Sequence, residues 1–384
     1  MDFSYNDNQQ MLADSVDRFL ASRYDLPARA RLIGDPQGRD RLWREMADLG
    51  WIGAAFPESA GGYAESPVDV MAVMERFGRH LVVEPFVVTA ILCGRLLVDG
   101  MGEERDALIA RTIAGDLQLA LAAGSTHCLR SPEHHGFSAR REGGDFVLQG
   151  RMPVVLNADR AGLLLVAART AGGNGDLEGM TLFAVDADAS GVSRRGFRMI
   201  DGHGAAELVL DAVRVSAESV LGEPDGAVPL IERALDHGIA AVCAEALGAM
   251  THLNAATAEH IRTREQYGAP LARFQVLQHR MADMYIQTET ARSMAYLATL
   301  SLDACETDRR RDLSAAKVQV GRSGKYVGYH AVQLHGGMGV SEELDIGHHY
   351  IRLTMIDRLF GDQAFHLQRF AGIRDSESSE LEPD

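Results

Sequence analysis

The chain has 384 residues, of which 46% are hydrophobic and 24% are charged, a composition typical of a globular enzyme with two or three domains. Its formal net charge of −16 argues against non-specific nucleic-acid binding, because contacts with phosphates require a basic surface. No apolar run has the length that spans a bilayer, and the opening MDFSYNDNQQ lacks the basic and apolar regions of a secretory signal.

Residues 1–115 have the pattern of an N-terminal helical domain. Asn6 or Asp7 can cap a first helix, because apolar residues recur at helical spacing directly after them. Breaks that contain glycine or proline separate further expected helices at residues 39–49, 66–79, 85–98 and 103–114.

The pattern changes to strands in residues 116–224. Short apolar runs are separated by turn signals such as Gly143-Gly-Asp145. Strands are expected at residues 117–122, 145–148, 163–166, 180–185 and 207–210. Because no crossover helices lie between these runs, we predict a compact antiparallel β domain rather than a doubly wound sheet.

Helices return in residues 225–384. Apolar residues recur every three or four positions from Leu235 to Leu253 and again from Leu277 to Ala295. Two further helices are expected at residues 312–334 and 341–360. Long amphipathic helices joined by short turns predict a C-terminal four-helix bundle, so the fold class is α+β.

The cysteines suggest neither a disulfide framework nor a metal site. Cys93, Cys128, Cys243 and Cys305 are far apart and do not have the spacing of metal ligands. We therefore expect reduced thiols, a cytoplasmic protein and no bound metal.

The first of two polar motifs in the last domain lies between two predicted helices. Its residues are Arg264, Gln266, Phe274 and Gln275, around a Tyr-Gly-Ala-Pro turn. A guanidinium can bind phosphate oxygens through two hydrogen bonds and a flat ring can stack on a base, so the set suits a nucleotide diphosphate. Any helix-turn-helix with a basic residue before its turn would look similar.

The second motif is QLHGGMG, with Gln333, Leu334, His335, Gly336 and Gly337 as its candidate binding residues. It offers amide and backbone donors, and its glycines allow close approach of a ligand. By itself a Gly-Gly pair is equally typical of a helix end. Together the two motifs favour a dinucleotide cofactor.

The domain order and the two motifs REQYGAPLARFQ and QLHGGMG resemble the acyl-CoA dehydrogenase family over essentially the whole chain. Within the family, segments such as PVDVMAVMERFGR and SAAKVQVGRSGKYVG are most similar to small subunits of pimeloyl-CoA dehydrogenases. The resemblance implies FAD as cofactor and an acyl-CoA as substrate. A carboxylate base would remove the α proton while the β hydrogen leaves as hydride, giving a trans-2-enoyl-CoA, with an electron-transfer flavoprotein as the electron acceptor.

The resemblance also implies roles for the motif residues, which would contact the FAD of a neighbouring subunit. Arg264 and Gln266 would hold the pyrophosphate, and Phe274 and Gln275 would line the adenosine end. Residues 333–337 would close over it. An oligomer is therefore expected.

Two segments depart from the family pattern around the flavin ring. A Gly-Ser-Asp-containing segment and a Trp-Ile-Thr segment are replaced by residues 122–128 and 152–158. Val154, Val155 and Leu156 have no side-chain hydrogen-bond donor, so we expect that this chain holds the ring poorly by itself.

The catalytic base is also altered. Asp362 stands where many family members have glutamate, and its side chain is one methylene shorter. A second branch has its base at the position of Gly238, which has no side chain. Asp362 is therefore the candidate base, and the alternative is a capping or surface carboxylate.

These features leave three hypotheses. The leading one is a subunit of a two-plus-two heterotetramer that contributes the adenosine and pyrophosphate half of an FAD site to a partner acyl-CoA dehydrogenase subunit. The second is a self-sufficient homotetrameric dehydrogenase that uses Asp362. The third is a non-catalytic scaffold subunit.

Overall fold

A computed structural model describes residues 4–100, 105–123, 136–173 and 178–380. The chain folds into two compact units, each built from separate stretches of sequence. The first unit contains Met1–Gly34, Pro67–Val82 and Ile239–Asp384, and the second contains Asp35–Ser66 and Val83–Gly238.

The first unit is helical. Its N-terminal helices are α1 (Asp7–Arg23), α2 (Leu26–Gly34) and α4 (Pro67–His80). Asn6 caps α1 as expected: its side chain accepts a hydrogen bond from the Gln9 amide, and the Gln9 side chain accepts one from the Asn6 amide. Helix α2 was not expected from the sequence.

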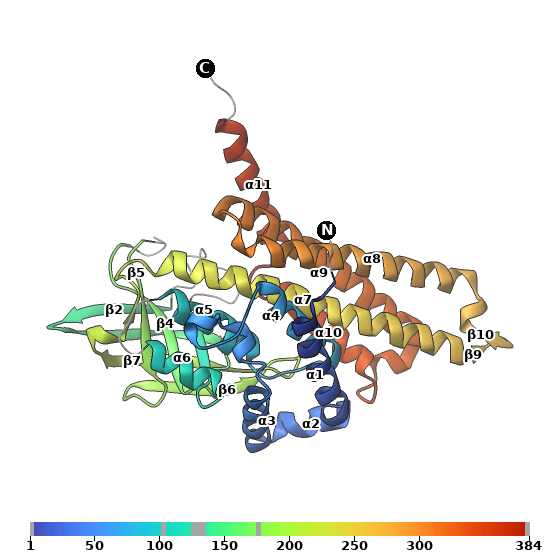
Figure 1. The fold of residues 1–384 in the computed structure, drawn as a ribbon, viewed down its shortest axis with the longest axis horizontal. Coiled ribbons are helices and arrows are strands. Elements are labelled where there is room, and N and C mark those ends of the chain that lie inside the picture. The colour runs from blue at the N-terminus through green and yellow to red at the C-terminus, as the bar shows by residue number, and fades with distance from the viewer. Residues whose placement is uncertain (1–3, 101–104, 124–135, 174–177, 381–384) are drawn as a thin grey trace. The chain divides into compact units, whose positions relative to one another are not determined.

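The C-terminal helices of this unit are α7 (Ala227–Thr263), α8 (Gln275–Leu300), α9 (Glu306–His335), α10 (Asp345–Arg358) and α11 (Gln363–Glu380). Helix α7 begins in the second unit and ends in the first. Figure 1 shows α8 and α9 side by side as an antiparallel pair. The predicted helices of the bundle are confirmed, and α11 is an additional helix.

Buried contacts between α4, α7 and α10 organise this unit. Because Gly78 of α4 and Gly248 of α7 have no side chain, the backbones of the two helices pack in direct contact. On the same part of α7, both carboxylate oxygens of Glu245 accept hydrogen bonds from Arg352 of α10, at 2.5 and 2.7 Å. Both side chains are buried, so the charges compensate each other away from water.

The second unit combines short helices with a β-sheet. The helices are α3 (Pro36–Asp48), a π-helix (Val87–Cys93) that continues into α5 (Gly94–Asp99), and α6 (Arg105–Ile113). The strands are β1 (Leu119–Ala122), β2 (Phe137–Glu142), β3 (Asp145–Leu156), β4 (Leu163–Arg169), β5 (Met180–Asp186), β6 (Val192–Arg198), β7 (Gly204–Val215) and β8 (Val220–Leu221).

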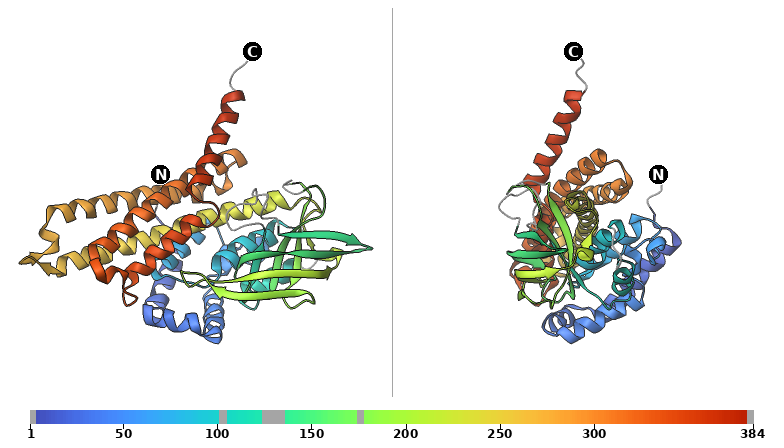
Figure 2. Two further views of the ribbon diagram at one scale, coloured as in Figure 1. Left: turned by 180° about the vertical axis from the view of Figure 1, so that it is seen from behind. Right: turned by 90° about the vertical axis from the view of Figure 1, so that its left-hand side faces the viewer.

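The strands form one sheet in the order β6-β7-β3-β2-β4-β5-β8, with β1 also paired to β4. Figure 2 shows this sheet in two further views. Most pairs are antiparallel, but β1 and β2 both run parallel to β4. The predicted fold class is confirmed, and the sheet departs from the expected antiparallel arrangement only in these two pairs of the described strands. The β2–β3 hairpin lies between β1 and β4 in the sequence, and this long connection permits a parallel pair.

One described helix, α7, is long and apolar enough to cross a membrane by length and composition alone. However, 72% of its apolar window is buried inside the protein, as in a core helix. The hydrophobicity of α7 is therefore accounted for by packing.

Candidate functional site

The first motif forms a short β-hairpin between α7 and α8. Strands β9 (Glu265–Gln266) and β10 (Ala269–Pro270) pair antiparallel around Tyr267 and Gly268, whose φ angles are 55° and 77°. Gly268 tolerates this left-handed backbone without strain. The Leu271 amide donates to the Arg264 carbonyl at 2.9 Å and closes the hairpin. The predicted turn is thus a structured hairpin.

The candidate side chains of this motif are available to a ligand. Arg264, Gln266 and Gln275 are exposed, and Phe274 is half-buried with its ring edge-on to Tyr267 at 6.2 Å. The Arg264 guanidinium makes no hydrogen bond or ion pair with a described residue. An unengaged guanidinium and an aromatic ring in one short segment fit a pyrophosphate and a base.

The second motif lies at the end of α9 and in the 3-10 helix η8 (Gly336–Val340). Gln333, Gly336 and Gly337 are exposed, whereas Leu334 and His335 are buried. A Cβ atom at Gly336 or Gly337 would meet nothing within 4 Å. Contacts among the described residues therefore do not require a glycine at 337, and the backbone there is open to a ligand or another chain.

The two motifs meet at one end of the first unit. The His335 ring stacks on His260 of α7 at 4.2 Å, and the Arg264 amide donates to the His260 carbonyl at 2.9 Å. Burial, with smaller contributions from His335 and Arg264, lowers the pKa of His260. The His335 ring is therefore used in packing, and the open glycines and free Arg264 are the parts that fit a dinucleotide.

In the second unit, the segment predicted to face a flavin ring supplies only backbone polar groups at its centre. Val155 is buried in the sheet core, and Val154 and Leu156 are half-buried. Asn157 follows with φ of 60°, and its side-chain amide donates to the Leu119 carbonyl at 3.0 Å. Residues 124–128 of the other departing segment lie outside the described residues.

Asp362 lies between α10 and α11 in the first unit. Its Oδ1 accepts a hydrogen bond from the Phe365 amide at 3.0 Å, and its Oδ2 lies 4.0 Å from Nη1 of Arg358. The carboxylate thus caps α11 in this structure. Gly238, at the other base position, is buried in α7.

Sequence reasoning missed two buried residues that hold the Asp362 loop. The Lys317 ammonium donates to the carbonyls of Asp357 and Gly361 at 3.1 and 2.9 Å, and burial lowers its pKa to about 8. A ring nitrogen of His366 lies 3.0 Å from the Phe360 carbonyl, and burial lowers the pKa of His366 to about 3. In the sequence, the one signal for these contacts is the position of Lys317 within the apolar face of a helix.

The chain matches two family models, "Acyl-CoA dehydrogenase, N-terminal domain" over residues 6–116 and "Acyl-CoA dehydrogenase, C-terminal domain" over residues 227–371. These matches together span well over half of the chain. It is similar to the mitochondrial short-chain specific acyl-CoA dehydrogenase of Homo sapiens, with 26% identity over 321 residues, or 82% of this chain and 77% of the human protein.

Two solved structures have the same fold. A variant of the "Tcur3481-Tcur3483 steroid ACAD" aligns with a TM-score of 0.84 and 26% identity, covering 97% of this chain and 99% of that one. The ChsE4-ChsE5 complex from Mycobacterium tuberculosis aligns with a TM-score of 0.85 and 23% identity over 100% of both chains. The chain therefore belongs to the acyl-CoA dehydrogenase family, flavin-dependent oxidoreductases that act on the CH–CH bond of acyl-CoA esters and use FAD as cofactor.

Proposed function

We propose that this chain is one subunit of a two-plus-two heteromeric acyl-CoA dehydrogenase that converts an acyl-CoA to a trans-2-enoyl-CoA. It would contribute the pyrophosphate and adenosine side of an FAD site whose ring is held mainly by a partner subunit. The observation that carries the proposal is a contrast within the chain. The exposed Arg264 motif and the open Gly336-Gly337 backbone fit the cofactor, whereas Val154 to Leu156 offer the ring no side-chain donor.

Exposed apolar side chains near the motifs support a partner. Among the described residues, large apolar side chains are exposed on the hairpin, α8 and η8: Tyr267 93%, Val276 60%, Tyr285 61%, Ile286 57%, Met338 51% and Val340 72%. Apolar surface of this extent is typical of protein interfaces. The similar structures whose names join two proteins also favour a heteromeric assembly.

The proposed chemistry divides between the subunits. Bound FAD supplies an acceptor for the β hydride of the acyl chain. On this chain, Arg264 would neutralise the pyrophosphate, Phe274 would pack at the adenosine end, and the open glycines would allow close backbone approach. The partner would supply the carboxylate that removes the α proton, and an electron-transfer flavoprotein would accept the electrons.

The test compares the chain purified alone with the chain co-expressed with a candidate partner subunit. We expect little flavin absorbance and no acyl-CoA oxidation from the chain alone, and both properties in a two-plus-two complex. Stoichiometric FAD and turnover by the chain alone would contradict the proposal.

The second candidate is a self-sufficient homotetramer, and the Asp362 loop favours it. Buried Lys317 and His366 fix the carbonyls next to Asp362, as expected of a loop whose carboxylate must be oriented. In that case Asp362→Asn should abolish turnover and leave FAD bound, because the amide cannot accept the α proton. Unchanged turnover would eliminate this candidate.

The acyl group is proposed only as a class. The resemblance to pimeloyl-CoA dehydrogenase small subunits favours a dicarboxylyl or aliphatic CoA ester, and the similar "steroid ACAD" adds bulky side chains as an option. Turnover of the assembled complex on one ester of each class would distinguish them.

A further inference from the structure

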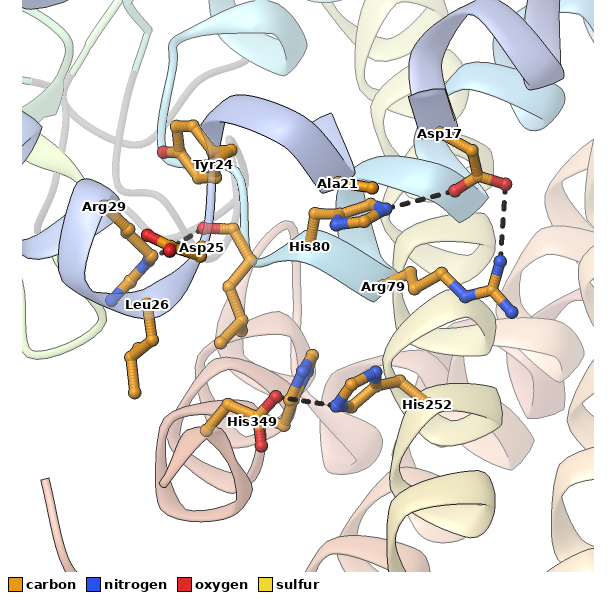
Figure 3. Close-up of a pocket in the computed structure, with 12 residues that line it drawn as sticks. Asp17, Ala21, Tyr24, Asp25, Leu26, Arg29, Arg79, His80, His252 and His349 are labelled. Atoms are coloured by element: carbon orange, nitrogen blue, oxygen red, sulfur yellow. Dashed lines mark hydrogen bonds and ion pairs between the residues drawn. The ribbon is translucent and has the colours of Figure 1, made fainter. Parts of the chain in front are cut away.

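A pocket of about 460 Å³ lies within the first unit, apart from the two cofactor motifs. It is lined by residues from α1, α2, α4, α7 and α10 and is open to solvent on one side. Figure 3 shows His252 of α7 beside His349 of α10 at its wall. Nothing in the proposed dehydrogenation uses these residues.

Three potential metal ligands converge at this wall. Asp345 and His349 are four residues apart on α10 and therefore share one face of the helix, opposite His252. One ligand atom from each of the three lies within 4.8 Å of the others. The two imidazole rings are stacked with their centroids 4.5 Å apart.

One ring nitrogen of this cluster lacks a hydrogen-bond partner. His349 is only 1% exposed, and its Nδ1 is buried with no hydrogen-bond partner among the described residues. Nε2 of His252 lies 2.7 Å from Oδ2 of Asp345 and interacts with this carboxylate. Buried polar atoms are normally paired, so Nδ1 of His349 is available to a further group at this wall.

The donor set suits a cation. Imidazole and carboxylate groups bind metals in their deprotonated forms. Here two imidazoles and one carboxylate face one another at the pocket wall.

Among the described residues, the ion-pair partner of Asp345 is His252. Arg79 and His80 lie 3.3 and 3.1 Å from Asp17, on another part of the pocket wall. Arg29 donates from Nε to the Leu81 carbonyl at 2.8 Å, although its charge contributes to the lowered pKa of His349.

We propose that His252, Asp345 and His349 form a binding site for a divalent transition metal ion such as Zn²⁺. Two imidazoles with one carboxylate suit this class of ion better than Mg²⁺ or Ca²⁺, which prefer oxygen ligands only. Ligands about 2.0–2.2 Å from one tetrahedral ion lie about 3.4 Å apart, so modest side-chain rotations bring the cluster to bonding distance. The open side of the pocket leaves room for water as a further ligand. The ion would tie α7 to the start of α10.

The test uses the full-length chain, stripped with a chelator and titrated with Zn²⁺ by calorimetry, with elemental analysis for stoichiometry. All proteins carry Cys305→Ser, which removes the exposed thiol among the described cysteines. His252→Ala and Asp345→Asn each remove one ligand, and His348→Ala removes a histidine of the same helix that lies outside the cluster. Co²⁺ absorption spectra report the coordination geometry.

We expect one ion per chain in the parent and in His348→Ala, and at least roughly tenfold weaker binding in both ligand variants. Zn²⁺ should also raise the melting temperature of the parent but not of the ligand variants, since only a native-state ligand stabilises the fold. Equal binding by the parent and the near-isosteric Asp345→Asn, or no saturable binding by the parent, would overturn the proposal. Neither measurement needs FAD or a partner, so the result is independent of the proposed function.

Discussion

Arg264 presents an exposed guanidinium beside the stacked pair His260 and His335. Hydrogen bonds to charged groups contribute about 1.5–3 kcal/mol. We therefore predict that Arg264→Ala, in the complex with the partner subunit, weakens FAD binding by roughly tenfold to a hundredfold. Equilibrium dialysis of FAD against the purified complex measures this change.

The matched control is Arg262→Ala, because Arg262 is exposed in the last turn of α7 and lies 3.9 Å from Glu259. This variant should bind FAD like the parent complex. If Arg264→Ala also retains full FAD content and turnover, the non-catalytic scaffold hypothesis gains support over the proposed function.

The crossing of α4 and α7 depends on two glycines. A Cβ at Gly248 would lie 1.7 Å from the Glu75 carbonyl oxygen, and one at Gly78 would lie 1.8 Å from that of Glu245. Because backbone atoms cannot move aside cheaply, Gly248→Ala should lower the free energy of unfolding by about 3 kcal/mol. Urea unfolding at equilibrium measures the effect.

Gly372→Ala is the control for this substitution. Gly372 lies in α11, where a Cβ would meet nothing within 4 Å. Alanine is the better helix former, so this variant should be neutral or more stable by about 0.5–1 kcal/mol. Equal destabilisation of both variants would show that the close helix crossing is not the cause.

Strands β2 and β6 show why some elements were not predicted. In β2, Phe137 and Ala139 are buried and alternate with exposed residues, a pattern too short to separate from the neighbouring loop. Strand β6 is largely exposed at the edge of the sheet and is held by its backbone pairing with β7. Such pairing leaves no hydrophobic pattern in the sequence.

Buried histidines should make the stability of the whole chain depend on pH. Burial, and then Lys317, lowers the pKa of His366 from 6.5 to about 3. Between these values the unfolded chain binds more protons than the folded chain, so stability is lost as pH falls from 6.5 towards 3. His366 alone should remove about 2 kcal/mol by pH 5, and His349 adds to the loss in the same direction.

Urea unfolding at pH 7 and pH 5, with a chelator present, tests this dependence. The variant His366→Gln lacks the titrating group and should show a smaller loss of stability between the two pH values. If the loss is as large in this variant as in the parent, His366 is not its source.

The sequence by itself determined the family, the sequence of helical and β segments, and the motifs that suit FAD. Each of these follows from residues that are close together in the chain: from apolar periodicity, from turn residues and from the motifs that contain Arg264 and Gly336.

Only the tertiary structure paired Glu245 with Arg352, placed Lys317 and His366 next to the Asp362 loop, and brought His252 close to Asp345 and His349. Contacts between residues far apart in the chain depend on how helices cross and on which side chains share a buried space. Neither is encoded in the spacing of residues along one segment.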